Sequence, residues 1–276
     1  MQRISLVDET FDLNFTLEYC LSIQLSLDGF SFSILDTVQN KVVYLFHQEL
    51  YEAEPDFLLK RLKTIYEESE LLELPYKKNR ILLSAPGRSC LIPYSYYQAN
   101  QLDRYLQTTL TPRSGFVAQS TAIPVFSQWI VFDTPQLILE FLQQKHPGTE
   151  LMNETRVVCP EFVRSHNTLK ITIHKKHIVL IALNEAGVCF FNSFPYDTEN
   201  DQLYYILGVV KQFGYDPEHL ILDGQVNKHA TIYHRLKQYF NQVEIAANPR
   251  GIHFSYLFDK LPDARFVTLF NSFVCV

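Results

Sequence analysis

The stretch that decides the fold is residues 20–36, which read CLSIQLSLDGFSFSILD. Apolar and polar residues alternate from Cys20 to Leu27 and again after Asp28-Gly29, and this period of two predicts two β-strands. Asp-Gly between such strands predicts a hairpin with a type I′ turn, because both residues tolerate positive φ. A third predicted strand, Lys41 to His47, extends the pair into an antiparallel meander.

Beyond the meander, the spacing of apolar residues changes from that of a strand to that of a helix. The elements expected next are a helix from Pro55 to about Leu72, a short strand from Arg80 to Ser84, a helix from Gln98 to Leu110, weaker strands at Gly115 to Ala118 and Trp129 to Phe132, and a helix from Pro135 to Lys145. The predicted order is therefore three strands, helix, strand and helix, followed by a less regular segment.

The same order begins again after Val158. The expected elements are strands at Leu169 to Ile173, Ile178 to Leu183 and Val188 to Phe194, a helix from Asp201 to Phe213 closed by Gly214, a strand at His219 to Leu222, a helix from Ala230 to Phe240 and a strand at Gln242 to Ala246. Leu21 to Asp36 and Leu169 to Asn184 share one apolar pattern without a gap. This repeat predicts two similar α/β lobes, residues 1–155 and 156–276.

Each lobe is expected to hold a mixed five-stranded sheet with helices on its faces. The strand reached through a helix should lie parallel to the first strand, by a right-handed crossover. The apolar stretch Phe266 to Val276 is expected to dock on the body or against a second copy of the chain.

Composition excludes several classes of function. The formal net charge is −6, which argues against binding a nucleic-acid backbone. Only nine glycines are present, no two closer than six residues, so the glycine-rich phosphate motifs are absent. The start, Met1 to Phe15, has no apolar core, and we expect a cytoplasmic protein without membrane association. Five cysteines without a C-x-x-C spacing predict buried free thiols.

The predicted order resembles a known architecture. Two lobes of βββαβα resemble the duplicated ribonuclease-H-like fold of the actin, sugar kinase and Hsp70 (ASKHA) superfamily. The sequence more closely resembles a bacterial family of unknown function with this actin-like ATPase fold, through Leu25 to Ile34 in the first lobe and Phe190 to Phe194 and Asp201 to Leu207 in the second. The resemblance covers nearly the whole chain. It implies a cleft between the lobes, where relatives hold a nucleotide with a metal ion.

The resemblance assigns phosphate binding to the two hairpin turns. In nucleotide-binding relatives, the first hairpin carries an acid and a glycine, which Asp28 and Gly29 could supply here, although Leu27 and Phe30 add bulk. The alternative is a turn that needs Asp-Gly for geometry alone. The second hairpin reads His174-Lys175-Lys176-His177 and has neither acid nor glycine. Its lysines attract a phosphate or simply form a solvated turn.

The loop that holds adenosine in relatives carries a pair of glycines. Here it contains Asp223 and a single glycine, Gly224, which also suit a plain turn after a strand. If Mg-ATP binds, Asp28, Gly29, Asp223 and Gly224 are the residues expected to hold it. We expect no catalytic residue and no metal-ligand set, because the histidine pairs lack chelating spacing. A two-metal nuclease is excluded in the first lobe by Ser and Gln at the polar positions of its first strand.

Aromatic residues supply the remaining signal. Tyr94, Tyr96 and Tyr97 lie close together, as do Tyr204 and Tyr205, and such side chains suit either a core or a protein interface. The leading hypothesis is a non-catalytic binding or scaffolding module with a protein partner. The alternative is a divergent Mg-ATP-binding protein, or a weak actin-like ATPase, that uses the cleft between the lobes. Nucleic acid is not expected as a partner, and a second copy of the chain is a candidate.

Overall fold

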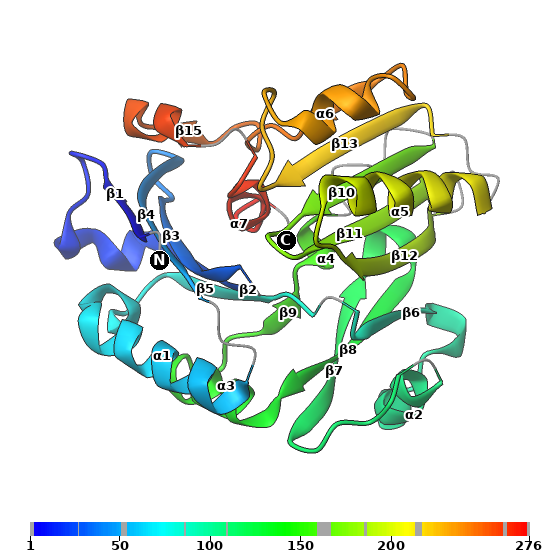
Figure 1. The fold of residues 1–276 in the computed structure, drawn as a ribbon. Helices are drawn as coiled ribbons and strands as arrows, with labels where there is room; N and C mark the ends of the chain where they lie inside the picture. The colour runs from blue at the N-terminus through cyan, green and yellow to red at the C-terminus, as the bar shows by residue number, and fades with distance from the viewer. Residues whose placement is uncertain are drawn as a thin grey trace.

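The computed structural model describes residues 3–26, 28–50, 54–85, 87–108, 110–158, 167–184, 187–212, 217–261 and 264–274. Within these ranges the chain forms two large sheets and a third, smaller one (Figure 1). The two large sheets lie in separate lobes, and helix α7 (Val267–Asn271) lies between them. No helix in these ranges has the length and apolarity needed to cross a membrane.

The first lobe contains the predicted meander, helix and parallel strand, with β1 (Arg3–Val7) before them and α3 (Gln136–Lys145) as the second helix. Its other elements are β2 (Tyr19–Ser26), β3 (Gly29–Asp36), β4 (Lys41–Glu49), α1 (Pro55–Glu68), β5 (Lys78–Leu83) and β9 (Leu151–Asn153). The sheet order is β1-β4-β3-β2-β5-β9, and β15 (His253–Phe254) also pairs with β4. This sheet therefore has seven strands rather than the five predicted, because β1 and β15 add to the β4 edge.

The second lobe repeats this topology with five strands, as the sequence predicts. Its elements are β10 (Thr168–Ile173), β11 (His177–Asn184), β12 (Gly187–Pro195), α5 (Glu199–Gln212), β13 (His219–Gly224), α6 (Thr231–Leu236) and β14 (Val243–Ile245). The order β12-β11-β10-β13-β14 matches β4-β3-β2-β5-β9 of the first lobe. β10 pairs parallel with β13, as β2 does with β5, so the predicted parallel pairing after each helix is confirmed.

An inserted sheet separates β5 from α3 in the first lobe. It consists of β6 (Ser89–Pro93), β7 (Phe116–Ile123) and β8 (Gln128–Pro135), with α2 (Leu102–Gln107) beside it. The helix predicted at Gln98 to Leu110 is therefore shorter and belongs to this insertion. The second crossover helix of the lobe is α3 instead. The weak strand signals after Gly115 are two full strands of a hairpin, which gain their stability from apolar contact with β11 and β12.

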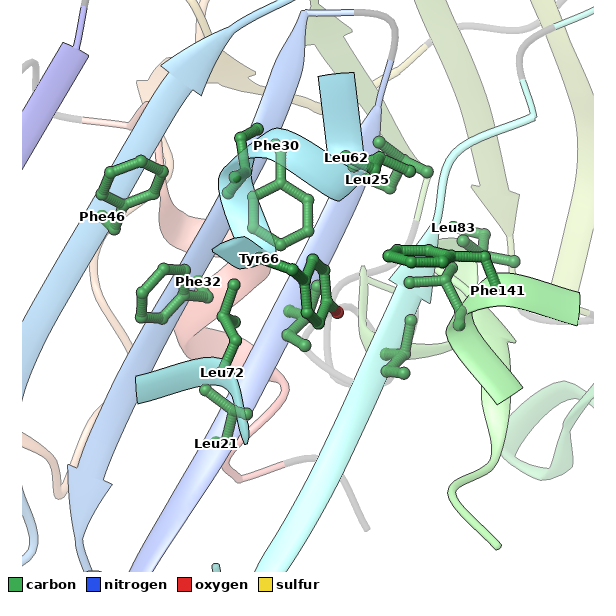
Figure 2. Close-up of a cluster of buried hydrophobic side chains, with 14 of the residues drawn as sticks. Leu21, Leu25, Phe30, Phe32, Phe46, Leu62, Tyr66, Leu72, Leu83 and Phe141 are labelled. Atoms are coloured by element: carbon green, nitrogen blue, oxygen red, sulfur yellow. The ribbon is translucent and has the colours of Figure 1, made fainter. Parts of the chain in front are cut away.

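The core of the first lobe lies between the sheet and helices α1 and α3 (Figure 2). Phe30 and Phe32 project from β3 toward Leu62 and Tyr66 of α1, and Phe141 of α3 packs edge-on against the Tyr66 ring at 5.1 Å. Burying a large side chain in such a core stabilises the fold by about 1.5–3 kcal/mol. This packing holds β2 and β3, and hence the turn between them, in place.

The opposite face of the first sheet is covered by the C-terminal segment. Apolar side chains of residues 252–273 pack on Cys20, Leu35 and Leu45, and the Ser272 hydroxyl lies 2.6 Å from that of Ser22. The predicted docking of the C-terminal stretch on the body is thus confirmed for the described residues up to Val274. The lobe boundary expected at 155/156 stays a prediction, and the segment after β14 crosses back to the first sheet.

The cysteines match the prediction in part. Cys20, Cys90 and Cys189 are free, but only Cys20 is buried and Cys189 on the edge strand β12 is exposed. Cys159, Cys275 and the helix end predicted at Gly214 lie outside the described residues.

Candidate functional site at the cleft between the lobes

The two hairpin turns to which the resemblance assigns phosphate binding meet each other across the cleft. Asp28 lies in the turn between β2 and β3, and His174 and Lys175 lie in the turn between β10 and β11. His174 Nδ1 donates to Asp28 Oδ2 at 2.6 Å, and the Lys175 backbone N–H donates to Asp28 Oδ1 at 2.8 Å. Both oxygens of this carboxylate therefore accept hydrogen bonds from the second lobe.

The pKa values of Asp28 and His174 are both shifted toward the ionised pair. Burial would raise the pKa of Asp28, but the hydrogen bond and charge of His174 outweigh it, and the pKa of Asp28 is lowered. Burial would lower the pKa of His174, but the hydrogen bond and charge of Asp28 outweigh it, so this pKa is raised. The interaction is thus a charge-assisted hydrogen bond, which is stronger than a neutral one.

His177, the first residue of β11, packs against the His174 ring. Their rings stack with centroids 4.4 Å apart, and burial, together with the charge on His174, lowers the pKa of His177 to about 3. The neutral His177 ring packs against the charged His174 ring and restricts its orientation. The sequence places these two histidines in the second hairpin turn, with a spacing unsuited to metal binding, and does not indicate that their rings stack.

The first turn lies one residue earlier than predicted. Ser26 pairs directly with Gly29, so Gly29 is the first residue of β3 and Asp28 precedes that strand in the turn. Asp28 is not among the residues with positive φ, which a type I′ turn requires at both central positions. The glycine is needed for another reason: a Cβ on Gly29 would lie 2.3 Å from the Gln48 carbonyl oxygen. Gly29 thus serves close strand packing.

The candidates in the adenosine loop have partners inside the second lobe. Asp223 at the end of β13 forms an ion pair with Lys170 of β10, with Nζ and Oδ2 2.6 Å apart and both side chains buried. Gly224 has φ +82°, and a Cβ there would lie 2.3 Å from the Ile173 carbonyl oxygen. Lys170 could not be recognised from the sequence, because in the strand pattern it is one more polar position.

The structure brings Asp28 and Gly224 to one small cavity between the lobes. Its volume is about 40 Å³, and Glu154, His174 and Arg265 also line it. Asp223 is buried beside it, and Gly29 does not line it. Ligand pockets in proteins typically measure ~300–1,000 Å³, so this space suits one or two water molecules rather than a nucleotide.

The residues around the cleft also do not fit the Mg-nucleotide that an actin-like ATPase fold implies. Asp28 already accepts from two donors of the second hairpin, and Asp223 faces an ammonium group rather than solvent. Within the described ranges, no three His, Cys, Asp or Glu side chains are grouped so that they could hold a metal ion. A phosphate group would have to separate the two turns before it could approach either backbone.

Comparisons with known proteins agree with this architecture. Residues 8–243 match the family described as "Protein of unknown function (DUF3822)", so the chain belongs to that family. The suspected resemblance to a family of unknown function is thereby confirmed. No curated protein matches this chain.

Solved structures share the fold. A Bacteroides thetaiotaomicron VPI-5482 protein with actin-like ATPase fold and unknown function superposes with a TM-score of 0.77 at 24% identity, over 86% of this chain and 94% of that one. The PilM-PilN type IV pilus biogenesis complex gives 0.59 at 10% identity, over 95% and 99%. The ethanolamine utilization protein EutJ from Carboxydothermus hydrogenoformans gives 0.51 at 9%, over 98% and 93%. These likenesses show the actin-like fold.

Proposed function

We propose that this protein is a non-catalytic binding or scaffolding module built on the actin-like fold. The observation that carries the proposal is the engagement of Asp28 by His174 and Lys175. The two turns that would cradle a phosphate in a nucleotide-binding relative instead hold the lobes together. We call this contact of Asp28 with His174 and Lys175 the clasp between the lobes.

The electrostatics of the cleft support the same conclusion. The small cavity is lined by the carboxylates of Asp28 and Glu154 as well as by His174 and Arg265. Glu49 lies 3.4 Å from Arg265 and 3.8 Å from Lys175, so the cations at this seam face protein carboxylates. A triphosphate would compete with these carboxylates for the same donors and would leave them buried without their partners, which is costly.

A protein is the partner class that the exposed surface favours. Tyr96 is 73% exposed and Tyr204 is 74% exposed, and such amphipathic rings are enriched at protein interfaces. Tyr97 stacks on Trp129 at 4.0 Å, which gives the inserted sheet a rigid aromatic surface. A structure of similar fold is the PilM-PilN type IV pilus biogenesis complex, which supports the compatibility of this architecture with a role in protein assembly. The net charge of −6 disfavours nucleic acid.

The experiment that tests the proposal is thermal unfolding with and without millimolar Mg-ATP. A ligand at ~100 times its dissociation constant adds about 2.7 kcal/mol of stability, and we expect no such shift. A clear shift would favour the alternative, a divergent Mg-ATP-binding protein. ATP hydrolysis by the purified protein that is abolished in Asp28→Ala would refute a non-catalytic role outright. Asp197→Ala, an exposed carboxylate at the end of β12, is the matched control.

A further inference from the structure

A second and much larger pocket lies where the first sheet meets the inserted sheet. It has a volume of about 340 Å³ and lies at the junction of β2, β5, α1, β7, β8 and α3; we call it the junction pocket. It is separate from the cleft between the lobes, although Ser26 borders both. Its volume falls within the ~300–1,000 Å³ range of pockets that hold small molecules.

The walls of the junction pocket are mainly apolar and come from rigid elements. Leu25, Leu83 and Ile138 are buried core residues of β2, β5 and α3, and half-buried Leu58 of α1 and Phe116 of β7 complete the apolar surface. Because these side chains also belong to or adjoin the core of the lobe, the pocket is preformed. Such a surface binds an aliphatic chain by removing it from water, at about 0.8 kcal/mol per methylene, which is about four-fold in affinity.

The rim of the pocket carries an excess of positive charge. Arg88 Nε donates to Asp133 Oδ2 at 2.6 Å, so these two charges compensate each other. The Arg113 guanidinium lies 5.6 Å from the centre of the Phe116 ring. Arg113 is exposed, and no ion pair of its side chain is found among the described residues. The ring fixes the guanidinium beside the pocket, where it could accept an anion.

We infer that the junction pocket binds a small carboxylic acid with an unbranched aliphatic chain of medium length. The chain would lie against Leu25, Leu58 and Leu83, and the carboxylate would accept hydrogen bonds from Arg113. The aliphatic chain of such a ligand matches the apolar walls of the pocket. Its single negative charge matches Arg113, because Asp133 already neutralises Arg88. This inference is independent of the proposal for the cleft, since it concerns a different part of the molecule.

Isothermal titration calorimetry with hexanoate, octanoate, decanoate and 1-octanol tests the assignment. We expect affinity to rise about four-fold per added methylene until the pocket is full, and octanoate to bind about five-fold more tightly than octanol. Absence of octanoate binding at millimolar concentration would overturn the inference. So would equal affinity for octanoate and octanol, since it would remove the role of the carboxylate.

Two variants locate the binding. Arg113→Gln is exposed and should fold normally, and we expect it to lower the affinity for octanoate to that for octanol while leaving octanol unchanged. Leu58→Gln should weaken both ligands, because it adds a polar group to the apolar wall. Arg104→Gln on α2 removes the same charge outside the pocket and is the control. Unchanged octanoate binding in both Arg113→Gln and Leu58→Gln would refute the site.

Discussion

Replacing Asp28 by Asn tests the clasp between the two lobes. The substitution keeps the shape of the side chain and one acceptor oxygen, but it removes the charge that pairs with His174. In the native protein the Asp28 and His174 side chains are only 13% and 6% exposed, so the pair is close to a buried one. Removing one partner of a buried ion pair lowers the free energy of unfolding by about 3–5 kcal/mol, whereas an exposed ion pair contributes only about 0–1 kcal/mol.

The expected loss for Asp28→Asn is therefore about 3 kcal/mol, because the remaining oxygen can still accept from the Lys175 N–H. Unfolding entropy of about 2.1 cal/mol/K per residue, over 276 residues, converts this loss into a decrease in melting temperature of about 5 °C. Asp197→Asn is the matched control. Its ion pair with Lys176 is exposed, with side chains 90% and 73% accessible, and its loss should change the melting temperature by less than ~2 °C.

The loss should also depend on pH in a defined way. The raised pKa of His174 means that its contribution is complete below its ordinary value of 6.5 and is lost as pH rises through the folded value. The lowered pKa of Asp28 means that its contribution is complete above its ordinary value of 3.8 and is lost as pH falls through the folded value. The difference between the native protein and Asp28→Asn should thus be largest between about pH 4 and 6.5.

The assay is denaturant unfolding of native protein, Asp28→Asn and Asp197→Asn at a series of pH values. Groups titrating elsewhere cancel when each variant is subtracted from the native protein at the same pH. A difference for Asp28→Asn that matches the Asp197 control, or one that grows steadily above pH 7, would refute the clasp. It would also remove the observation on which the proposed function depends.

Two further predictions test packing, one beside the cleft and one in the core of the first lobe. Gly224→Ala should destabilise the protein by about 3 kcal/mol in denaturant unfolding, whereas the control Gly251→Ala should cost about 1 kcal/mol. Both positions have positive φ, but of the two only Gly224 would place a Cβ against a backbone oxygen. Equal losses in the two variants would contradict the close packing at Gly224. His146, whose Nε2 lies 2.9 Å from the Tyr66 hydroxyl, has its pKa lowered by burial to about 4, so its contribution is complete above pH 6.5 and is lost as pH falls toward 4. As pH falls from 6.5 to 4.5, the unfolding free energy of His146→Gln should therefore decrease by about 2 kcal/mol less than that of the native protein. Parallel curves of unfolding free energy against pH for the two proteins would show that this histidine does not titrate as expected.

The sequence predicted the strands and helices of both lobes because their periodicity is local. Period-two alternation in residues 20–36 and 169–184 indicated two meanders, and the common order of elements indicated a duplication. The actin-like fold follows from that order, and the structure confirms it. The inserted sheet was read only as weak strands and a helix, because its strands are stabilised by apolar contact with β11 and β12, which lie much later in the chain.

The candidate site could be predicted only as a set of residues. Asp28 and the turn around His174 were recognised as corresponding positions of the two repeats. Nothing in a linear pattern indicated that they would bond to each other, because the partners are 146 positions apart. Lys170 read as an ordinary polar strand residue, and its pairing with Asp223 depends on the parallel register of β10 and β13.

The amino-acid order alone thus determined which side chains share a face of each strand and that the unit occurs twice. Only the tertiary structure decided what covers each face. Ser22 lies on the polar side of β2, yet it is fully buried because the C-terminal segment packs over it. In the same way, the two turns bond to each other across the lobes. The physical reason is that periodicity fixes the direction of a side chain, whereas its partner depends on how distant segments pack.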